Sequence, residues 1–174
     1  MPSDVLIRPE RRDDHDVLGA LITAAFAGKP YAEGDEAELL VALRDADALT
    51  LSLVAERDGV VLGQAAFSPA RSSSGAHGWY ALGPVAVLPA HQRKGIGSRL
   101  VRAGLEILRG RGADGCIVVG DTAYYTRFGF SVCPENAPSG QPADHFMVQV
   151  FRGARPSGPI SFHEAFGSAE DRAH

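Results

Sequence analysis

The sequence has little cysteine, no long apolar run and no excess of positive charge, and each lack excludes a class of protein. Cys116 and Cys133 lack CxxC spacing and lie in or beside apolar runs, so we expect two reduced thiols, with neither a disulfide nor a metal site. No stretch approaches the ~18 apolar residues of a membrane span, and residues 1–10 lack the basic-then-apolar pattern of a signal peptide. A net charge of -4 gives no reason to expect nucleic acid or an anionic membrane as a partner. We therefore expect a cytoplasmic protein.

The chain is long enough to bury a substantial core and leaves little room for a second domain. Its 174 residues are 45% hydrophobic, which is usual for a globular protein, and they contain no repeat and no domain-sized linker. We therefore predict a single domain, residues 1–174, with its core in residues 5–151. The Gly/Pro-rich tail, 152–174, contains Ile160, Phe162 and Phe166, which indicates that it packs on the body of the protein.

The pattern of apolar residues and turn signals predicts alternating strands and helices. Helices are expected near residues 17–25, 35–45, 95–109 and 122–128. Strands are expected at 5–7, 49–56, 60–67, 79–88, 116–119 and 145–151, and a flexible connection at 71–78. Asp58-Gly59 is a strong hairpin signal, while Pro84 cannot donate a ladder hydrogen bond and predicts a bulge or a splay in the middle of the sheet. The order of elements predicts a mixed α/β (α+β) sandwich with helices on the faces of one sheet.

Several polar residues and one glycine are expected at helix ends. Asp13, Asp14 and Asp16 fall in the first turn of the first helix, where the helix dipole favours negative charge. Asp121 is placed to cap the short helix near 122–128, and Gly129 is placed to end it.

The most informative stretch is residues 85–100, where an apolar strand leads through a glycine-containing turn into a helix. Free backbone N–H groups at a helix start attract anions, and Gly95 and Gly97 carry no side chain that would hold a phosphate away. Only Glu106 opposes six basic residues between Leu88 and Gly112, which are Arg93, Lys94, Arg99, Arg102, Arg109 and Arg111. Positive charge in an acidic protein is thus concentrated around one helix, which predicts a polyanionic ligand.

Two nucleotide-binding motifs compete for this stretch. A Walker-type loop is excluded, because the chain contains no GxxxxGK[ST]. A dinucleotide-binding turn fits better, since Gly95-x-Gly97 is present and Asp121 follows the next strand. However, the third glycine is missing, and residues 88–94 separate the strand end from Gly95. This spacing argues against a dinucleotide-binding turn. A lone GxG is weak evidence, because glycines often serve only to pack a helix against a sheet.

Two motifs together resemble the GNAT superfamily of N-acyltransferases. Gln92-x-x-Gly95-x-Gly97 is similar to its acyl-CoA signature, [Q/R]-x-x-G-x-[G/A], and residues 124–130, YYTRFGF, are similar to its F-Y-x-x-x-G-F landmark. The element order agrees, so the resemblance covers roughly residues 5–151. The segments 82–87, 120–125 and 165–166 resemble the bacterial YhbS-like branch of the superfamily.

The resemblance implies a mostly antiparallel central sheet and an acetyl-CoA-dependent N-acetyltransferase that needs no metal. The amine would attack the thioester directly within a ternary complex. The backbone amide of Val87 would hold the oxyanion, and Tyr125 would protonate the leaving thiolate as general acid. The residues implied in cofactor binding are Val85, Ala86, Val87, Gln92, Arg93, Lys94, Gly95, Ile96, Gly97 and Ser98.

The base and the acceptor are less well defined. Many family members carry a glutamate on the central strand, and none occurs here between Trp79 and Leu88. We expect a water-mediated route for the proton that the amine loses. The side chains that could instead act as the general base are His77, His91, Asp121, Glu33 and Glu36. We expect His77 and His91 to be exposed histidines and not general bases. Glu33 and Glu36 lie where the family usually lines its acceptor side and are weak candidates for attracting a cationic amine, although a solvated acidic helix start explains them equally well.

The acceptor is expected to be a small-molecule or peptide amine, and dimerisation is common among such folds. A rival from another class is a non-catalytic acyl-CoA-binding sensor or partner module, which would keep the glycine loop and tend to lose the acid. Tyr125 favours the enzyme, although a lone tyrosine is usually a core aromatic.

Overall fold

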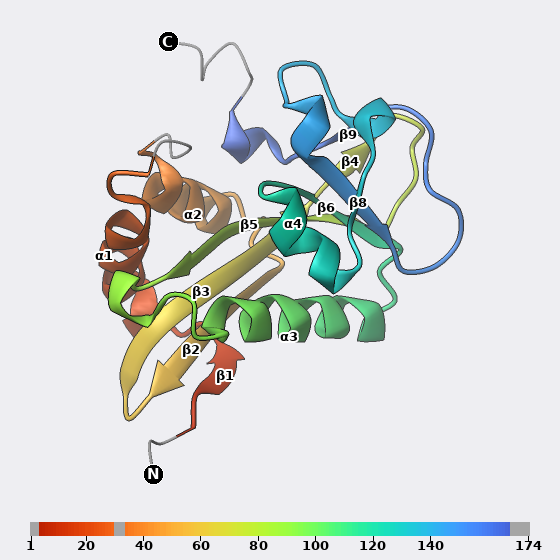
Figure 1. Cartoon of the computed structure of the whole chain (residues 1–174). Coiled ribbons are helices and arrows are strands. Elements are labelled where there is room, and N and C mark those ends of the chain that lie inside the picture. The colour runs from red at the N-terminus through yellow and green to blue at the C-terminus, as the bar shows by residue number, and fades with distance from the viewer. Residues whose placement is uncertain (1–3, 30–33, 168–174) are drawn as a thin grey trace. The chain divides into compact units, whose positions relative to one another are not determined.

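The computed structural model describes residues 4–29 and 34–167, which contain nine strands and four α-helices (Figure 1). The strands are β1 (Leu6–Pro9), β2 (Leu51–Arg57), β3 (Val60–Pro69), β4 (Arg71–Ser72), β5 (Trp79–Val87), β6 (Gly115–Val119), β7 (Ser131–Val132), β8 (Phe146–Val150) and β9 (Ile160–Ser161). The helices are α1 (His15–Phe26), α2 (Glu36–Asp45), α3 (Ile96–Gly110) and α4 (Thr122–Tyr125). Seven strands form one sheet in the order β1-β2-β3-β5-β6-β8-β7, and β4 pairs with β9.

The chain divides into two compact units. The first unit comprises Met1–Phe67 and Gly83–Leu105, and the second comprises Ser68–Leu82 and Glu106–His174. Strands β3 and β5 and helix α3 each continue from one unit into the other along the chain. The single domain expected from the chain length stays a prediction.

The first unit contains an antiparallel arrangement of β1, β2 and β3. Leu6 pairs with Glu56 at one end of β1, and β2 continues into β3 through the hairpin that Asp58-Gly59 predicted. Both turn residues are left-handed, with φ of 52° and 81°, as a two-residue turn of this kind requires. The register shifts between Ala55 and Glu56, so the side chains of β3 exchange faces at this bulge.

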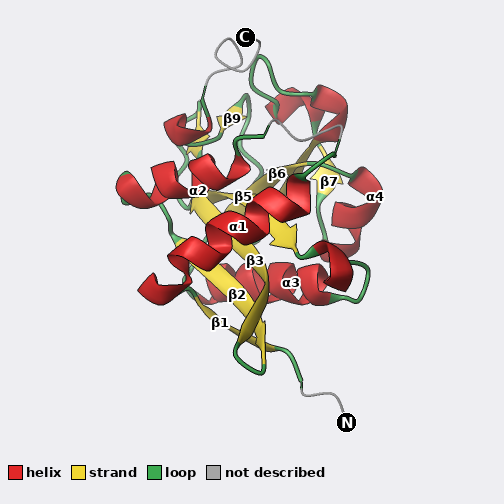
Figure 2. Ribbon diagram, turned by 90° about the vertical axis from the view of Figure 1, so that its left-hand side faces the viewer, coloured by secondary structure: helices red, strands yellow, loops and turns green. Residues whose placement is uncertain are grey.

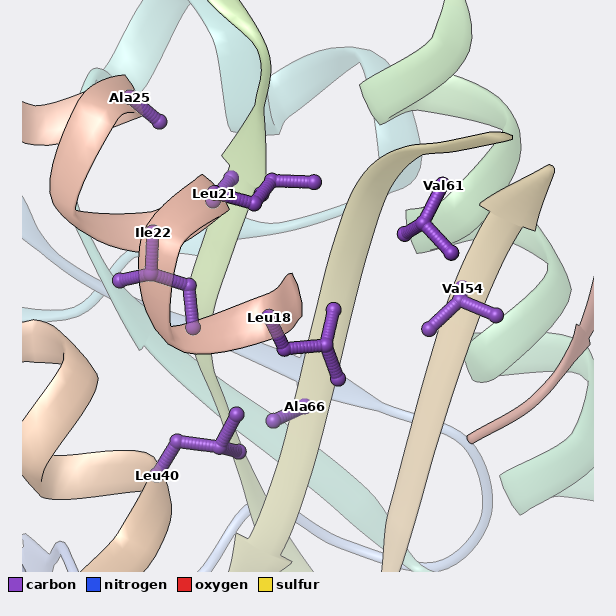
Figure 3. Close-up of a cluster of buried hydrophobic side chains, with 9 residues drawn as sticks. Leu18, Leu21, Ile22, Ala25, Leu40, Val54, Val61 and Ala66 are labelled. Atoms are coloured by element: carbon purple, nitrogen blue, oxygen red, sulfur yellow. The ribbon is translucent and has the colours of Figure 1, made fainter. Parts of the chain in front are cut away.

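One face of this sheet is covered by α1 and α2. Figure 2 shows α1 in front of β2 and β3, and Figure 3 shows side chains of both helices directed at the strands. The cluster combines helical spacing along α1 with one residue of α2 and four residues of the strands: Leu18, Leu21, Ile22, Ala25, Leu40, Val54, Val61, Ala66 and Ala86. At roughly 25 cal/mol per Å² of apolar surface, such burial is the main force that holds the two helices on the sheet.

The other face of β3 carries α3. A methyl group added at Gly104 would lie 2.1 Å from a ring carbon of Phe67, and one at Gly63 would lie 3.1 Å from Leu100. Both glycines therefore allow α3 to approach the sheet closely. The predicted helices on both faces of the sheet are confirmed within the first unit.

A buried ion-pair cluster joins β1 to the start of α1. The Arg8 guanidinium donates to both carboxylate oxygens of Asp14, at 2.8 and 2.9 Å, and to Glu56 at 2.6 Å. The hydrogen bond from Arg8 is the largest cause that lowers the pKa of Asp14 to about 2. Asp16 lies in the first turn of α1 as predicted, whereas Asp13 and Asp14 lie in the 3-10 helix Arg12–Asp14 that directly precedes α1, and Asp14 is the N-cap residue of α1. Arg8 is six positions from Asp14, but the Glu56 that completes the cluster through Arg8 lies 48 positions from Arg8, so the cluster as a whole has no local sequence pattern.

The second unit contains the one parallel pair of the large sheet. Trp79 to Ala81 of β5 pair in parallel with Gly115 to Ile117 of β6, while β6 pairs antiparallel with β8, as does β7. The mixed, mostly antiparallel sheet is thus as predicted. The β5–β6 register runs from Trp79 to Ala81, and the peptide bond between Gly83 and Pro84 is cis; the bulge or splay expected at Pro84 stays a prediction.

The core of the second unit includes part of the tail. Ile160 is fully buried beside Trp79, Phe146 and other apolar residues of β5, β6 and β8. The Phe162 ring contacts those of Phe146 and Phe166, with centroids 6.3 and 4.9 Å apart. The segment 71–78, predicted to be a flexible connection, contains β4, which pairs with β9 of the tail, so the prediction is wrong for its first two residues.

Candidate functional site

The predicted cofactor residues follow one another from β5 into α3, all within the first unit. Strand β5 ends at Val87, a 3-10 turn spans Pro89–His91, and α3 begins at Ile96. The side-chain amide of Gln92 donates to the carbonyl of Val87 at 2.9 Å. The glutamine of the motif thus ties the loop back to the end of the strand.

The loop backbone is left-handed at two positions. Arg93 has a φ of 64° and Gly95 a φ of 85°. An L-residue in this region is uncommon and costs roughly 1–2 kcal/mol, so the position of Arg93 is maintained by its surroundings. A methyl group added at Gly95 would meet nothing within 4 Å. Glycine is therefore favoured at 95 by the backbone conformation, and the space beside it is open.

The start of α3 presents a set of backbone donors. Arg99 makes a helical hydrogen bond to the carbonyl of Gly95, so the N–H groups of Ile96, Gly97 and Ser98 lie in the first turn, before any i−4 acceptor within the helix. The helix dipole adds partial positive charge at the same end. Arg93 and Lys94 are exposed directly before this turn. Amides, dipole and basic side chains together form a site suited to a phosphate-rich anion.

The three strand residues that precede the loop differ in environment. Ala86 is buried and packs in the α1/α2 cluster. Val85 and Val87 are half-buried and alternate with it along the strand. The N–H of Leu88 donates to the carbonyl of Leu62, which anchors the end of β5 on β3 immediately before the loop.

Tyr125 lies in the second unit, at the end of α4. Asp121 caps this helix as predicted, since its carboxylate accepts from the N–H groups of Ala123 and Tyr124 at 2.9 and 3.3 Å. Gly129, with a φ of 103°, ends the following 3-10 turn as predicted. The Tyr125 ring is half-buried and contacts three aromatic neighbours of the motif, which are Tyr124, Phe128 and Phe130. Phe128 and Phe130 are buried packing residues, as expected.

The candidate bases fall in different places. Glu33 lies outside the described residues. His77 is exposed as expected, whereas His91 is half-buried and its Nδ1 has no hydrogen-bond partner in the described part of the chain, so the prediction that His91 is exposed is wrong. Asp121 is engaged as a cap. Glu36, the first residue of α2, lines a cavity of about 300 Å³. The other lining residues come from α1, from α2 and from the chain between them: Ile22, Thr23, Phe26, Ala27, Gly28, Lys29, Gly34 and Ala37.

The cysteines supply no nucleophile in the described structure. Both are free, and burial raises the pKa of Cys116 and that of Cys133, which disfavours the reactive thiolate form. Among residues 4–29 and 34–167 there is no group of three potential metal ligands. No helix in these ranges combines the length and apolar character that crossing a membrane requires.

Sequence reasoning missed two residues that contact the tyrosine turn. Gly120 lies against the Tyr125 ring, and His145 hydrogen-bonds to Gly120 through its backbone and its side chain. Gly120 begins the segment 120–125 that resembles the YhbS-like branch, but nothing in the sequence indicated its role, and His145 is 25 positions away. No local pattern connects the two.

Comparison with known proteins agrees with both motifs. The model of the Acetyltransferase (GNAT) family matches residues 18–130. The chain is 34% identical over 170 residues to YhbS of Escherichia coli K12, an uncharacterized N-acetyltransferase, covering 93% of this chain and 98% of the relative. A GNAT family acetyltransferase from Brucella melitensis, crystallised with acetyl-CoA, is 45% identical with a TM-score of 0.84, covering 94% and 99% of the two chains. E. coli YhbS crystallised with CoA is 30% identical with a TM-score of 0.86, covering 97% and 94%. The chain therefore belongs to the GNAT family of acetyltransferases.

Proposed function

We propose that this protein transfers the acetyl group of acetyl-CoA to an amine by direct attack within a ternary complex. The observation that carries the proposal is the loop of residues 92–98, where two left-handed residues precede three backbone donors at the start of α3. Support comes from the two relatives crystallised with acetyl-CoA or CoA, which share 45% and 30% of aligned residues with this chain.

The cofactor would occupy the first unit as follows. Its diphosphate binds the amides of residues 92–98, and Arg93 and Lys94 supply the compensating charge. Its pantetheine arm lies along Val85, Ala86 and Val87. This arrangement requires no metal, because backbone dipoles and basic side chains neutralise the phosphates.

The reaction would proceed through one tetrahedral intermediate. The amine nitrogen forms a bond to the thioester carbon, and the carbonyl electrons move to oxygen, where the N–H of Val87 stabilises the charge. A preorganised donor of this kind is worth ~3–4 kcal/mol of barrier. The C–S bond then breaks, and the Tyr125 hydroxyl gives its proton to the departing sulfur, whose thiol form has a pKa of ~8.5. Water accepts the proton that the amine loses, and in turn restores that of Tyr125.

The acceptor would enter beside α1 and α2. The cavity there, about 300 Å³, lies at the small end of the ~300–1,000 Å³ range of ligand pockets, which favours a small amine or a single side chain of a peptide. Ile22, Phe26 and Ala37 offer an apolar wall. The lining also carries one charge of each sign, on Glu36 and Lys29, and Glu36 is the residue that would face an ammonium group.

An assay of thiol release tests the proposal against the sensor alternative. The protein is incubated with acetyl-CoA and a panel of small and peptide amines, and free CoA thiol is followed with a chromogenic disulfide. We expect amine-dependent thiol release, together with saturable acetyl-CoA binding by calorimetry. Binding without release across the panel would favour the sensor module, and absence of binding would contradict both readings.

A further inference from the structure

The ring of the proposed general acid lies directly on a glycine. A methyl group added at Gly120 would be 2.7 Å from Cε2 of Tyr125, 3.3 Å from Cδ2 and 3.7 Å from Cζ. Gly120 is not among the left-handed glycines, so its backbone conformation is open to any residue. The glycine is therefore required by the space that the ring occupies.

The ring has little room to move elsewhere. Tyr124 and Phe130 contact it edge-on, with centroids 5.0 and 6.1 Å away, and Phe128 lies at 6.2 Å. Phe128 and Phe130 are themselves buried. Ordinary contact begins near 3.4 Å, so an added methyl group at Gly120 would push the ring by about 0.7 Å against these neighbours.

Gly120 is held in place by one residue from a neighbouring strand end. Its N–H donates to the carbonyl of His145 at 3.3 Å, and its carbonyl accepts a hydrogen bond from Nδ1 of His145 at 3.1 Å. The acceptor is a carbonyl, so Nδ1 carries the proton. These bonds extend the antiparallel pairing of Val119 with Phe146, and both polar backbone groups of Gly120 are thereby satisfied.

We propose that Gly120, fixed by His145, is the positioning residue that sets where the Tyr125 hydroxyl lies. This inference rests on the proposed function, because it assigns a geometric requirement to the proposed proton donor. Gly120 touches neither cofactor nor substrate in this scheme and acts only through the tyrosine. A misplacement of about 1 Å at a reacting group can cost ~10²-fold in rate, so the methyl group has a measurable consequence.

The first test replaces Gly120 with alanine. We expect Gly120→Ala to lower kcat by ~10- to 100-fold. The KM for acetyl-CoA should stay near that of the wild type, since every proposed cofactor ligand lies on β5, the loop or α3. The matched control is Gly110→Ala in the same unit, where an added methyl group meets nothing within 4 Å and the rate should not change. Wild-type kcat in Gly120→Ala would overturn the inference.

The second test asks whether the loss passes through the tyrosine hydroxyl. We expect Gly120→Ala to have no further effect on kcat in a Tyr125→Phe background, because the hydroxyl is already absent. A general structural defect would reduce kcat by the same factor in both backgrounds, which would overturn the inference. If Tyr125→Phe alone turns over at the wild-type rate, the proposed acid fails; if Tyr125→Phe is slow and Gly120→Ala is normal, only the positioning role fails.

A third variant tests the role of the histidine and does not depend on the added methyl group. His145→Ala keeps Gly120 and removes the bond from Nδ1, while the backbone bond between the two residues is retained. We expect a smaller fall in kcat than with Gly120→Ala, and we expect it to vanish in the Tyr125→Phe background. An unchanged kcat in folded His145→Ala would remove the histidine from the arrangement.

Discussion

The loop of residues 92–98 in the first unit and the tyrosine turn in the second both depend on glycine, for opposite reasons. At Gly95 the backbone is left-handed and the space beside it is open. At Gly120 the backbone is ordinary and the space is filled by the Tyr125 ring. The loop thus keeps room for a ligand that approaches from outside, whereas the turn keeps room for a side chain of the protein itself.

Filling the open space at the loop should abolish cofactor binding. Gly95→Glu forces a side chain into a left-handed position and brings a carboxylate to the place proposed for the diphosphate, so charge and clash act together. We expect no saturable acetyl-CoA binding by calorimetry. Gly110→Glu adds the same charge at an exposed position at the end of α3 and should bind like the wild type. Normal affinity in Gly95→Glu would contradict the proposed site.

Removing the hydroxyl at the tyrosine turn should spare binding and slow turnover. Tyr125→Phe keeps the ring contacts with Tyr124 and Phe130 and loses only the proton donor, so we expect kcat to fall ~10²-fold or more with unchanged acetyl-CoA affinity. The neighbouring Tyr124→Phe is the control, because its ring serves packing and lies under the Arg127 guanidinium. Comparable kcat values for the two variants would remove Tyr125 from the mechanism.

The parts of this molecule that could be predicted from the sequence are those determined by nearby residues. Helix α1 follows from the spacing of Leu18, Leu21, Ile22 and Ala25, and the hairpin from Asp58-Gly59. The cap at Asp121 and the helix end at Gly129 depend on residues two to four positions away, and both were predicted. The glycine loop was recognised because its motif is contiguous.

The unpredicted parts depend on contacts between distant residues. Strands β4 and β9 contain two residues each and pair across 88 or more positions, so neither carries a periodic pattern. Arg8 binds both Asp14 and Glu56, and Glu56 lies 48 positions from Arg8 along the chain. The hydrogen bonds between Gly120 and His145 likewise join residues far apart in the sequence, 25 positions from each other. Tertiary packing decides which side chain lies beside a glycine. The different roles of Gly95 and Gly120 could therefore not be predicted from the sequence.

The Asp14 ion pair with Arg8 contributes to the stability of the first unit. Because the folded-state pKa of Asp14, about 2, lies below its ordinary value of 3.8, its stabilising effect is present above about pH 4 and is lost as the pH falls toward 2. We expect Asp14→Asn to lower the free energy of unfolding by about 3 kcal/mol at pH 7, since it leaves the buried Arg8 guanidinium with Glu56 alone.

Urea denaturation at several pH values measures this effect. The difference between wild type and Asp14→Asn should shrink as the pH falls from 4 toward 2, where the wild-type carboxyl itself becomes protonated. Asp13→Asn, at the exposed neighbouring position, should match the wild type at every pH. A difference that is the same at pH 7 and at pH 3 would show that the charge of Asp14 is not the source of its contribution.

The smallest expected effect concerns a polar side chain that no part of the described structure satisfies. Gln64 of β3 is fully buried, and neither its Oε1 nor its Nε2 has a hydrogen-bond partner. It pairs with Val54 and lies two residues before Ala66, on the same face of β3, so its amide lies on the face covered by α1 and α2, among aliphatic side chains. A buried polar group without a hydrogen-bond partner destabilises the folded state by about 1–3 kcal/mol. An apolar residue of similar size carries no such penalty.

We therefore expect Gln64→Met to raise the melting temperature by roughly 2–4 °C, which corresponds to about 1 kcal/mol in a chain of this length. Val54→Ala, which shortens its paired neighbour, should lower it, because that change only removes buried apolar surface. A fall in the melting temperature of Gln64→Met would mean that the carboxamide is stabilised in the folded protein by a group that binds beneath α1. In that event the first unit would hold a polar binding position in its core as well as at the start of α3.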